Sequence, residues 1–225
     1  MLKEYNADFY EKEYLNGTNS NYGESYFTED KIKSYESTAK NIKDIFSPKR
    51  VLEIGCAYGY IVKFLNELGI EAHGVDISNY AIEHSKHKNC IKLDVMKERL
   101  PFEDNSFDLI IIIDVLEHFP EDSLDFVFSE LKRVGSDKVY MFIPTIVYPG
   151  LQDREEYETE PSHINVPTLS HIIKRFEDAD FCADFIQRLS FWDYKIILTK
   201  KLKEEIIKPE LERNMELKKE RNKSK

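Results

Sequence analysis

The sequence predicts an α/β fold in which a mostly parallel sheet has helices on both faces. Short apolar segments alternate along the chain with amphipathic segments at helical spacing, which is the element order of such a sheet. The segment 51–60, VLEIGCAYGY, predicts a buried strand, a turn of small residues and the start of a helix. The segment 106–118, SFDLIIIIDVLEH, has an unbroken apolar run without the alternation of a half-exposed strand. We therefore expect this strand to be central and covered on both faces.

The remaining elements follow from periodicity and from turn residues. Strands are expected to begin at residues 51, 71, 90, 106, 138, 185 and 194, with the last two forming an antiparallel pair. The third of them is expected to span 90–95, and the fourth to continue into a helix by residue 118. Helices are expected at 28–46, 61–68, 79–86, 123–134 and 167–179.

Composition limits the kind of protein. A chain of 225 residues with 41% hydrophobic and 33% charged residues suits one substantial domain with appendages. The net charge of −10 makes nucleic acid an unexpected main partner, because binding to phosphates needs a basic surface. No apolar run reaches membrane-spanning length, and the N-terminus lacks the apolar core of a secretion signal. Cys56, Cys90 and Cys182 lack metal-ligand spacing, so we expect reduced thiols and a cytoplasmic location.

The turn after the first strand has the features of a ligand-binding loop. Gly55, Ala57 and Gly59 leave it almost without side chains, which lets the backbone approach a ligand closely. The loop has neither the Gly-x-Gly-x-x-Gly pattern of dinucleotide sites nor the Gly-Lys-Ser/Thr of triphosphate sites. Glu53 would repel a pyrophosphate but suits a ligand with an ammonium group. These features favour S-adenosylmethionine over a nucleotide phosphate.

The pattern Glu53-x-Gly55-x-Ala57-x-Gly59 resembles the first motif of class I S-adenosylmethionine-dependent methyltransferases. It departs from the usual Gly-x-Gly-x-Gly at Ala57, by one methyl group. The resemblance covers about residues 45–200. It implies a Rossmann-like methyltransferase fold, with a seven-stranded sheet whose C-terminal strand runs antiparallel. It also implies S-adenosylmethionine as the cofactor and S-adenosylhomocysteine as the product.

Acidic residues after the next two strands complete the expected cofactor site. Asp76 is placed to accept the ribose hydroxyls, or it caps the following helix. In the family, an acidic residue at the place of Asp94 faces the adenine amino group, and the next backbone amide meets the ring. Asp94 also suits a simple turn. The residues expected to bind the cofactor are Glu53, Gly55, Cys56, Ala57, Gly59, Asp76, Ile77, Asp94, Val95 and Asp114.

Two histidines are the candidate catalytic residues. His118 follows the fourth strand and His163 lies in the long segment after the fifth, and either suits a general base near neutral pH. His118 is alternatively structural. With Asp114, Glu117 and His163 it also resembles the ligand set of metal-assisted small-RNA 2′-O-methyltransferases and of some quinone-precursor O-methyltransferases. Asp114 is shorter than the Glu often found there, so a divalent metal is the less favoured alternative and no metal ligand is assigned.

The chain divides into three expected parts. Residues 1–45 form an aromatic-rich lid or helical segment, 46–200 the cofactor-binding domain, and 201–225 a charged tail. We expect methyl transfer to an oxygen or nitrogen of a small molecule such as a sugar, a quinone or a secondary metabolite. The alternatives are a macromolecular acceptor, RNA or protein, docked by the basic tail, and a non-catalytic cofactor-binding homologue. The acidic segment 153–160 either favours a cationic acceptor or is a solvated loop.

Overall fold

The computed structural model describes residues 7–15, 28–146, 162–164, 169–188 and 193–200. The helices are α1 (Lys12–Leu15), α2 (Glu29–Phe46), α3 (Tyr60–Glu67), α4 (Asn79–Glu83), α5 (Leu124–Val134) and α7 (Leu169–Asp178), with 3₁₀ turns η1 (Leu116–His118) and η2 (Glu121–Ser123). The strands are β1 (Arg50–Ile54), β2 (Glu71–Asp76), β3 (Cys90–Lys92), β4 (Phe107–Ile112), β5 (Gly135–Ile146), β6 (Phe181–Arg188) and β7 (Asp193–Lys200). The expected alternation of strands and helices is confirmed.

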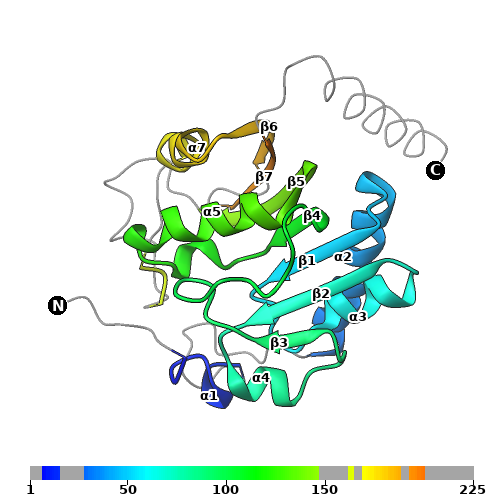
Figure 1. Cartoon of the computed structure of the whole chain (residues 1–225). Coiled ribbons are helices and arrows are strands. Elements are labelled where there is room, and N and C mark those ends of the chain that lie inside the picture. The colour runs from blue at the N-terminus through cyan, green and yellow to red at the C-terminus, as the bar shows by residue number, and fades with distance from the viewer. Residues whose placement is uncertain (1–6, 16–27, 147–161, 165–168, 189–192, 201–225) are drawn as a thin grey trace.

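The strands form one sheet in the order β3-β2-β1-β4-β5-β7-β6 (Figure 1). β1 lies parallel between β2 and β4, with Ile54 opposite both Val75 and Ile112. β7 runs antiparallel to both of its neighbours, β5 and β6. Because Ile54, Val75 and Ile112 are in register, the turns after β1, β2 and β4 meet at one edge of the sheet. In parallel α/β sheets, this edge is where ligands bind.

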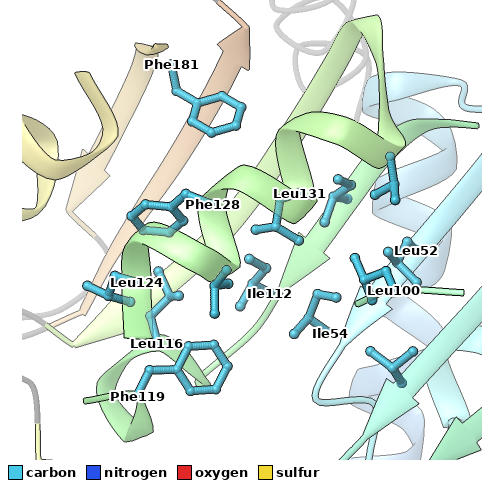
Figure 2. Close-up of a cluster of buried hydrophobic side chains, with 14 of the residues drawn as sticks. Leu52, Ile54, Leu100, Ile112, Leu116, Phe119, Leu124, Phe128, Leu131 and Phe181 are labelled. Carbon is cyan, nitrogen blue, oxygen red and sulfur yellow. The ribbon is translucent and has the colours of Figure 1, made fainter. Parts of the chain in front are cut away.

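Helices cover both faces of the sheet, as the unbroken apolar run of β4 predicts. Ile110 and Ile112 pack into a buried cluster that also contains Phe128 of α5 and Phe176 of α7. Figure 2 shows Ile112 and Phe128 in this cluster. Residues one position apart point to the other face, where Leu109 joins side chains of α2 and α3. Both faces of this strand are therefore buried, and no alternation of polar residues is needed.

Three expected elements are shorter than the sequence suggested or are replaced by a turn. β3 ends at Lys92 rather than at residue 95, because Asp94 begins a turn in which its Oδ1 accepts from the backbone amide of Met96 at 3.1 Å. After β4 the chain forms no α-helix by residue 118. Asp114 has a left-handed backbone with φ of 52°, and only the 3₁₀ turn Leu116–His118 follows before Pro120. Helix α4 also ends early, at Glu83.

The N-terminal segment is attached to the start of α4. The carboxylate of Glu11 accepts from the backbone amides of Asn79 at 3.0 Å and Tyr80 at 2.8 Å. Tyr14 and Leu15 pack in a small cluster with Tyr58 and Ala81. None of the described helices combines the length and the hydrophobicity needed to cross a bilayer. The acidic segment 153–160 and the tail 201–225 lie outside the described residues.

Candidate functional site

A cavity of about 440 Å³ lies where the turns after β1, β2 and β4 meet. Every residue that the sequence assigned to cofactor binding, apart from Gly59, contributes to its wall, and so do both candidate catalytic histidines. The wall also includes residues that the assignment left out, among them Tyr10, Tyr14, Lys31, Tyr35 and Tyr58. The structure therefore brings the predicted site together and adds to it a set of aromatic residues and one lysine.

The turn after β1 is shaped by glycines that have no room for a side chain. Gly55 has φ of 71°, and a Cβ on it would lie 2.4 Å from Cγ2 of Val115. Gly59 has φ of 66°, and its Cβ would lie 2.3 Å from Sγ of Cys90. Ala57 adopts φ of 45°, which costs an L residue about 1–2 kcal/mol. Glycine is thus required at 55 and 59 for space as well as for backbone conformation.

Glu53 is a buried acidic residue of the cavity wall. It lines the cavity although the residue is only 5% exposed. Among the described residues, its Oε2 has no hydrogen-bond partner. Burial raises the pKa of Glu53 well above 4.5, and the nearby Cys90 and Asp76 add to the rise. An ionised carboxylate in such a place needs a cation beside it, which a ligand with an ammonium group would provide.

Asp76 connects the turns after β1 and β2. Its Oδ2 accepts from the amide of Ala57 at 2.7 Å, and its Oδ1 accepts from the amide of Ser78 at 2.8 Å. Burial raises the pKa of Asp76, while these two amides act in the opposite direction. Asp76 therefore accepts from a backbone amide just before α4, which is part of the capping role that the sequence allowed. The N-cap of α4 itself is Ser78, whose Oγ accepts from the amide of Ala81 at 3.0 Å. Further lone pairs of the carboxylate remain for ribose hydroxyls, a role that stays a prediction.

Asp94 has the turn geometry that the sequence left open. Its Oδ1 accepts from Met96, and its backbone amide donates to Oε1 of Glu98 at 2.9 Å. Asp94 and Val95 nevertheless line the cavity. Their contact with an adenine ring stays a prediction.

The wall of the cavity also holds Glu117, His118 and His163, which lie close together. A carboxylate oxygen of Glu117 and one ring nitrogen of each histidine lie within 4.8 Å of one another. Glu117 is 0% exposed and His163 is buried. Asp114 is exposed and is not a member of this group, although it lines the cavity. The sequence reasoning thus named three residues that meet in space and one that stands apart.

His118 is held in one orientation. Its Nδ1 lies 3.1 Å from the backbone oxygen of Ser162. Because a carbonyl oxygen can only accept, this contact places the proton on Nδ1 and leaves the lone pair of neutral His118 on Nε2. The rings of Tyr10 and His163 stand edge-on to the imidazole, with centroids 5.5 Å and 4.8 Å away.

Sequence reasoning missed Lys31 and Ser162. Lys31 is a charged residue at the start of a helix, which normally indicates a solvated position. A usable signal was its spacing from Tyr35 and Ala39, because residues four apart share one face of a helix. Ser162 contributes its backbone oxygen, for which the sequence has no signal.

Side chains are described for two of the three cysteines, Cys56 and Cys90, and neither forms a disulfide. Cys56 lines the cavity, and its side chain lies against Gly74, where a Cβ would be 2.7 Å from its Sγ. Cys56 thus packs as a small side chain within the loop.

Comparisons with known proteins point to one family. A model described as a methyltransferase domain matches residues 27–184. A mitochondrial ubiquinone biosynthesis O-methyltransferase of Schizosaccharomyces pombe is 29% identical over 156 residues, which cover 64% of this chain and 56% of that protein. A sterol 24-C-methyltransferase of Gibberella zeae is 29% identical over 174 residues, covering 69% of this chain and 42% of that one. The chain spans about half the length of the curated relatives it matches.

Solved structures share the fold. The PH0226 protein of Pyrococcus horikoshii superposes with a TM-score of 0.65 at 21% identity, covering 84% of this chain and 99% of that one. A SAM-dependent methyltransferase of Archaeoglobus fulgidus has a TM-score of 0.61 at 20% identity, covering 75% of this chain and 94% of that one. The α/β Rossmann-like methyltransferase fold is thereby confirmed. Since the family model matches more than half of the chain, with most of the sheet and of the cavity wall, this chain belongs to the methyltransferase domain family.

Proposed function

We propose that this enzyme transfers the methyl group of S-adenosylmethionine to an oxygen or nitrogen atom of a small-molecule acceptor. The observation that carries the proposal is the oriented His118 beside His163 in the wall of the cavity. The relatives include a ubiquinone and a sterol methyltransferase, which supports a small-molecule acceptor such as a quinone precursor, a sugar or another metabolite.

The residues of the cavity fit the cofactor. Gly55 is a place where a Cβ has no room, so the backbone itself can form the cradle of a ligand. The buried Glu53 suits the ammonium group of the cofactor, and Asp76 suits its ribose hydroxyls. We call the group formed by Glu53, the turn 55–59 and Asp76 the donor side, and we assign Ile77, Asp94, Val95 and Asp114 to cofactor binding with it.

When bound, the cofactor supplies a methyl group that is already activated on a sulfonium ion, so the chain mainly has to position the acceptor and exclude water. We call Glu117, His118 and His163, together with Tyr10 and Tyr14, the acceptor side. Nε2 of His118 accepts the proton of the acceptor hydroxyl or amine, and the hydrogen bond to Ser162 stabilises the resulting imidazolium orientation. His163 is the second candidate base.

The N-terminal segment acts as a lid in this proposal. Tyr10 and Tyr14 line the cavity and stand edge-on to His118, with centroids 5.5 Å and 6.4 Å away. Glu11 holds the segment to α4 through two backbone amides. The division into a lid of residues 1–45, a domain of 46–200 and a tail of 201–225 remains part of the proposal. We also propose that the seven-stranded order with antiparallel β7 is the complete sheet of the enzyme, which the ladders of β7 with β5 and β6 support.

A metal-assisted form of the reaction is the second candidate, favoured by the one carboxylate and two imidazoles within 4.8 Å. This donor set suits divalent ions such as Zn²⁺ or Mn²⁺. The hydrogen bond from Nδ1 of His118 to a backbone carbonyl is also the usual support of a metal-ligating histidine. Nε2 of His118 cannot hold a proton and a metal at once, so the two candidates exclude each other at this atom.

One experiment separates these candidates. The enzyme is incubated with S-adenosylmethionine and panels of phenols, catechols, sugars and amines, with a chelator or with Mn²⁺ or Zn²⁺, and S-adenosylhomocysteine is measured. Turnover that survives the chelator and disappears in His118→Ala supports the base. Turnover that requires metal supports the second candidate. The exposed His171 provides the control variant His171→Ala. No turnover with any small molecule, together with salt-sensitive methylation of RNA or methylation of protein, would contradict the proposal.

A further inference from the structure

Two cysteine side chains lie next to each other at the turn after β1. Cys56 is part of this turn, and Cys90 is the first residue of β3, the strand at one edge of the sheet (Figure 1). Both residues are buried and belong to the same hydrophobic cluster. The proposed methyl transfer uses neither thiol, so the pair needs an explanation of its own.

Gly74 of β2 shows how the two sulfur atoms come together. Gly74 is in register with Cys90, so the side-chain directions of these two residues point to the same face of the sheet. A Cβ on Gly74 would lie 2.7 Å from Sγ of Cys56. The thiol of Cys56 therefore fills the space that Gly74 leaves open, beside the side chain of Cys90. A hydrogen bond between the two thiols raises the pKa of Cys56 and lowers the pKa of Cys90.

The pair can be reached from the cofactor cavity. Cys56 belongs to the cavity wall, whereas Cys90 lies behind it. A small uncharged molecule such as hydrogen peroxide that enters the cavity therefore meets the thiol of Cys56. A cofactor bound in the same cavity would cover this thiol.

The two sulfur atoms also support both ends of the cofactor-binding turn. At its start, the amides of Gly55 and Cys56 donate to the backbone oxygen of Val75 at 2.8 Å and 3.0 Å. At its end, Sγ of Cys90 lies 2.3 Å from the place that a Cβ of Gly59 would take. The sulfur atoms of a disulfide are only about 2.05 Å apart, much closer than two thiols in contact. Formation of a disulfide would therefore shift both sulfur atoms and change the shape of the turn.

We propose that Cys56 and Cys90 form a peroxide-sensitive pair, whose disulfide weakens the binding of S-adenosylmethionine. Hydrogen peroxide oxidises one thiol to a sulfenic acid and is itself reduced to water. The other sulfur, as a thiolate, attacks the sulfenic sulfur, forms the S–S bond and expels hydroxide, which takes up the released proton. In total, two thiols lose two electrons and two protons, and one peroxide becomes two water molecules. The disulfide rests on the two cysteines alone, whereas its effect on binding rests on the proposed function.

The test treats the full chain with hydrogen peroxide and examines a non-reduced digest by mass spectrometry. The wild type is expected to give a linked pair of peptides that contain Cys56 and Cys90. Calorimetry is expected to show that the affinity for S-adenosylhomocysteine falls about tenfold or more and returns after treatment with dithiothreitol. Saturating S-adenosylhomocysteine, added before the peroxide, is expected to slow the linkage because it covers Cys56.

Cys90→Ser is the diagnostic variant, and Cys182→Ser is its matched control. Cys182 lies on β6, at the opposite edge of the sheet from β3. Thermal unfolding should show that both variants fold. Cys90→Ser is expected to give no linked peptides and to keep its affinity through a brief peroxide treatment, whereas Cys182→Ser should respond as the wild type does.

Three results would overturn the proposal. In the first, both thiols of the treated wild type remain free, or Cys56 is oxidised without becoming linked to Cys90. In the second, the linked protein binds S-adenosylhomocysteine as tightly as the reduced protein. In the third, Cys90→Ser loses as much affinity as the wild type, because oxidation of Cys56 alone would then explain the loss. A reduced wild type that binds no S-adenosylhomocysteine would instead contradict the proposed function, and the digest would still show whether the disulfide forms.

Discussion

The donor side and the acceptor side of the cavity are assembled in different ways. On the donor side, Glu53, the turn 55–59 and Asp76 belong to neighbouring parallel strands and the turns directly after them. Backbone groups help to fix the shape of this side, because the amides of Ala57 and Ser78 donate to the Asp76 carboxylate. On the acceptor side, His118 meets His163 and Tyr10, which come from three distant parts of the chain.

The difference separates what a short motif can specify from what the whole fold must specify. The donor side is formed by a strand, a turn and an acidic residue that follow one another closely along the chain. A single substitution there should therefore change both the shape of the turn and the binding of the ligand. The acceptor side depends on side chains brought together by long-range packing, so changes there should affect the chemistry and spare cofactor binding. The following variants test this contrast.

The largest effect is expected for Gly55→Val. Its side chain would meet Val115, and the φ of 71° is unfavourable for any L residue. We expect a loss of about 2–5 kcal/mol in the free energy of unfolding and no measurable binding of S-adenosylhomocysteine by calorimetry. Gly69→Val is the control, because Gly69 has φ of 83° but nothing within 4 Å of its Cβ position. It should lose stability through strain alone and still bind; normal binding by Gly55→Val would show that the turn does not cradle the cofactor.

His118→Ala should lower turnover about 10²–10⁴-fold, the range expected for loss of a general base, once an acceptor is identified. The dissociation constant of S-adenosylhomocysteine should stay unchanged, because His118 lies on the acceptor side. Steady-state kinetics and calorimetry measure the two quantities. A loss of cofactor affinity would remove the distinction between the two sides, and unchanged turnover would make His118 structural.

Asp76→Asn should weaken the binding of S-adenosylhomocysteine by about 1.5–3 kcal/mol. Asn has only one side-chain oxygen, so its NH₂ group would face the N–H of either Ala57 or Ser78 and one of these two hydrogen bonds would be lost. The protein without ligand should therefore be less stable. Asp108→Asn is a matched control, since Asp108 accepts from the amides of Lys49 and Arg50 at 2.8 Å and does not line the cavity. Asp108→Asn should cost stability without affecting binding. An Asp76→Asn variant with normal affinity would exclude the ribose contact.

The smallest effect is expected in the pH dependence of binding. Burial raises the pKa of Glu53 in the protein without ligand, and an ammonium group beside it would lower that pKa. Binding should therefore release a proton when the pH lies below the raised value. Affinity should increase as the pH rises toward that value and then level off. Calorimetry in buffers of different ionisation enthalpy measures the release, and Glu53→Gln should abolish it; identical proton release in the variant would contradict the role of Glu53.

The sequence was sufficient to predict the fold class and which residues of the donor side lie together in the cavity wall, because both depend on local order. Burial of both faces explains the apolar run of β4, and the glycines at 55 and 59 match their left-handed backbone. The end of β3 was harder to predict, since Asp94 forms a turn through its own side chain. The helix expected after β4 was wrong, because the left-handed Asp114 and Pro120 leave room only for a 3₁₀ turn.

The acceptor side could be predicted only as a set of candidates. His118 and His163 were named from their residue type and their place after strands, but nothing local determines that they meet. Tyr10 and Tyr14 belonged to an aromatic segment in which no single residue stood out. Glu117 was considered with Asp114, and the structure separates the two. Contacts across more than 40 residues of chain depend on the packing of the whole domain, which periodicity does not reveal.

The contact between Gly55 and Val115 has a mechanical consequence. Val115 fills the space that a side chain at 55 would occupy, and it lies two residues before Glu117. The turn proposed to cradle the cofactor and the loop with the candidate base are therefore in direct contact, and Val115 sets the separation between them. A direct displacement requires its three reacting atoms in line, and small errors in their separation are costly. In the proposed methyl transfer, the volume of Val115 therefore helps to set the distance between the cofactor-binding turn and the loop that carries His118.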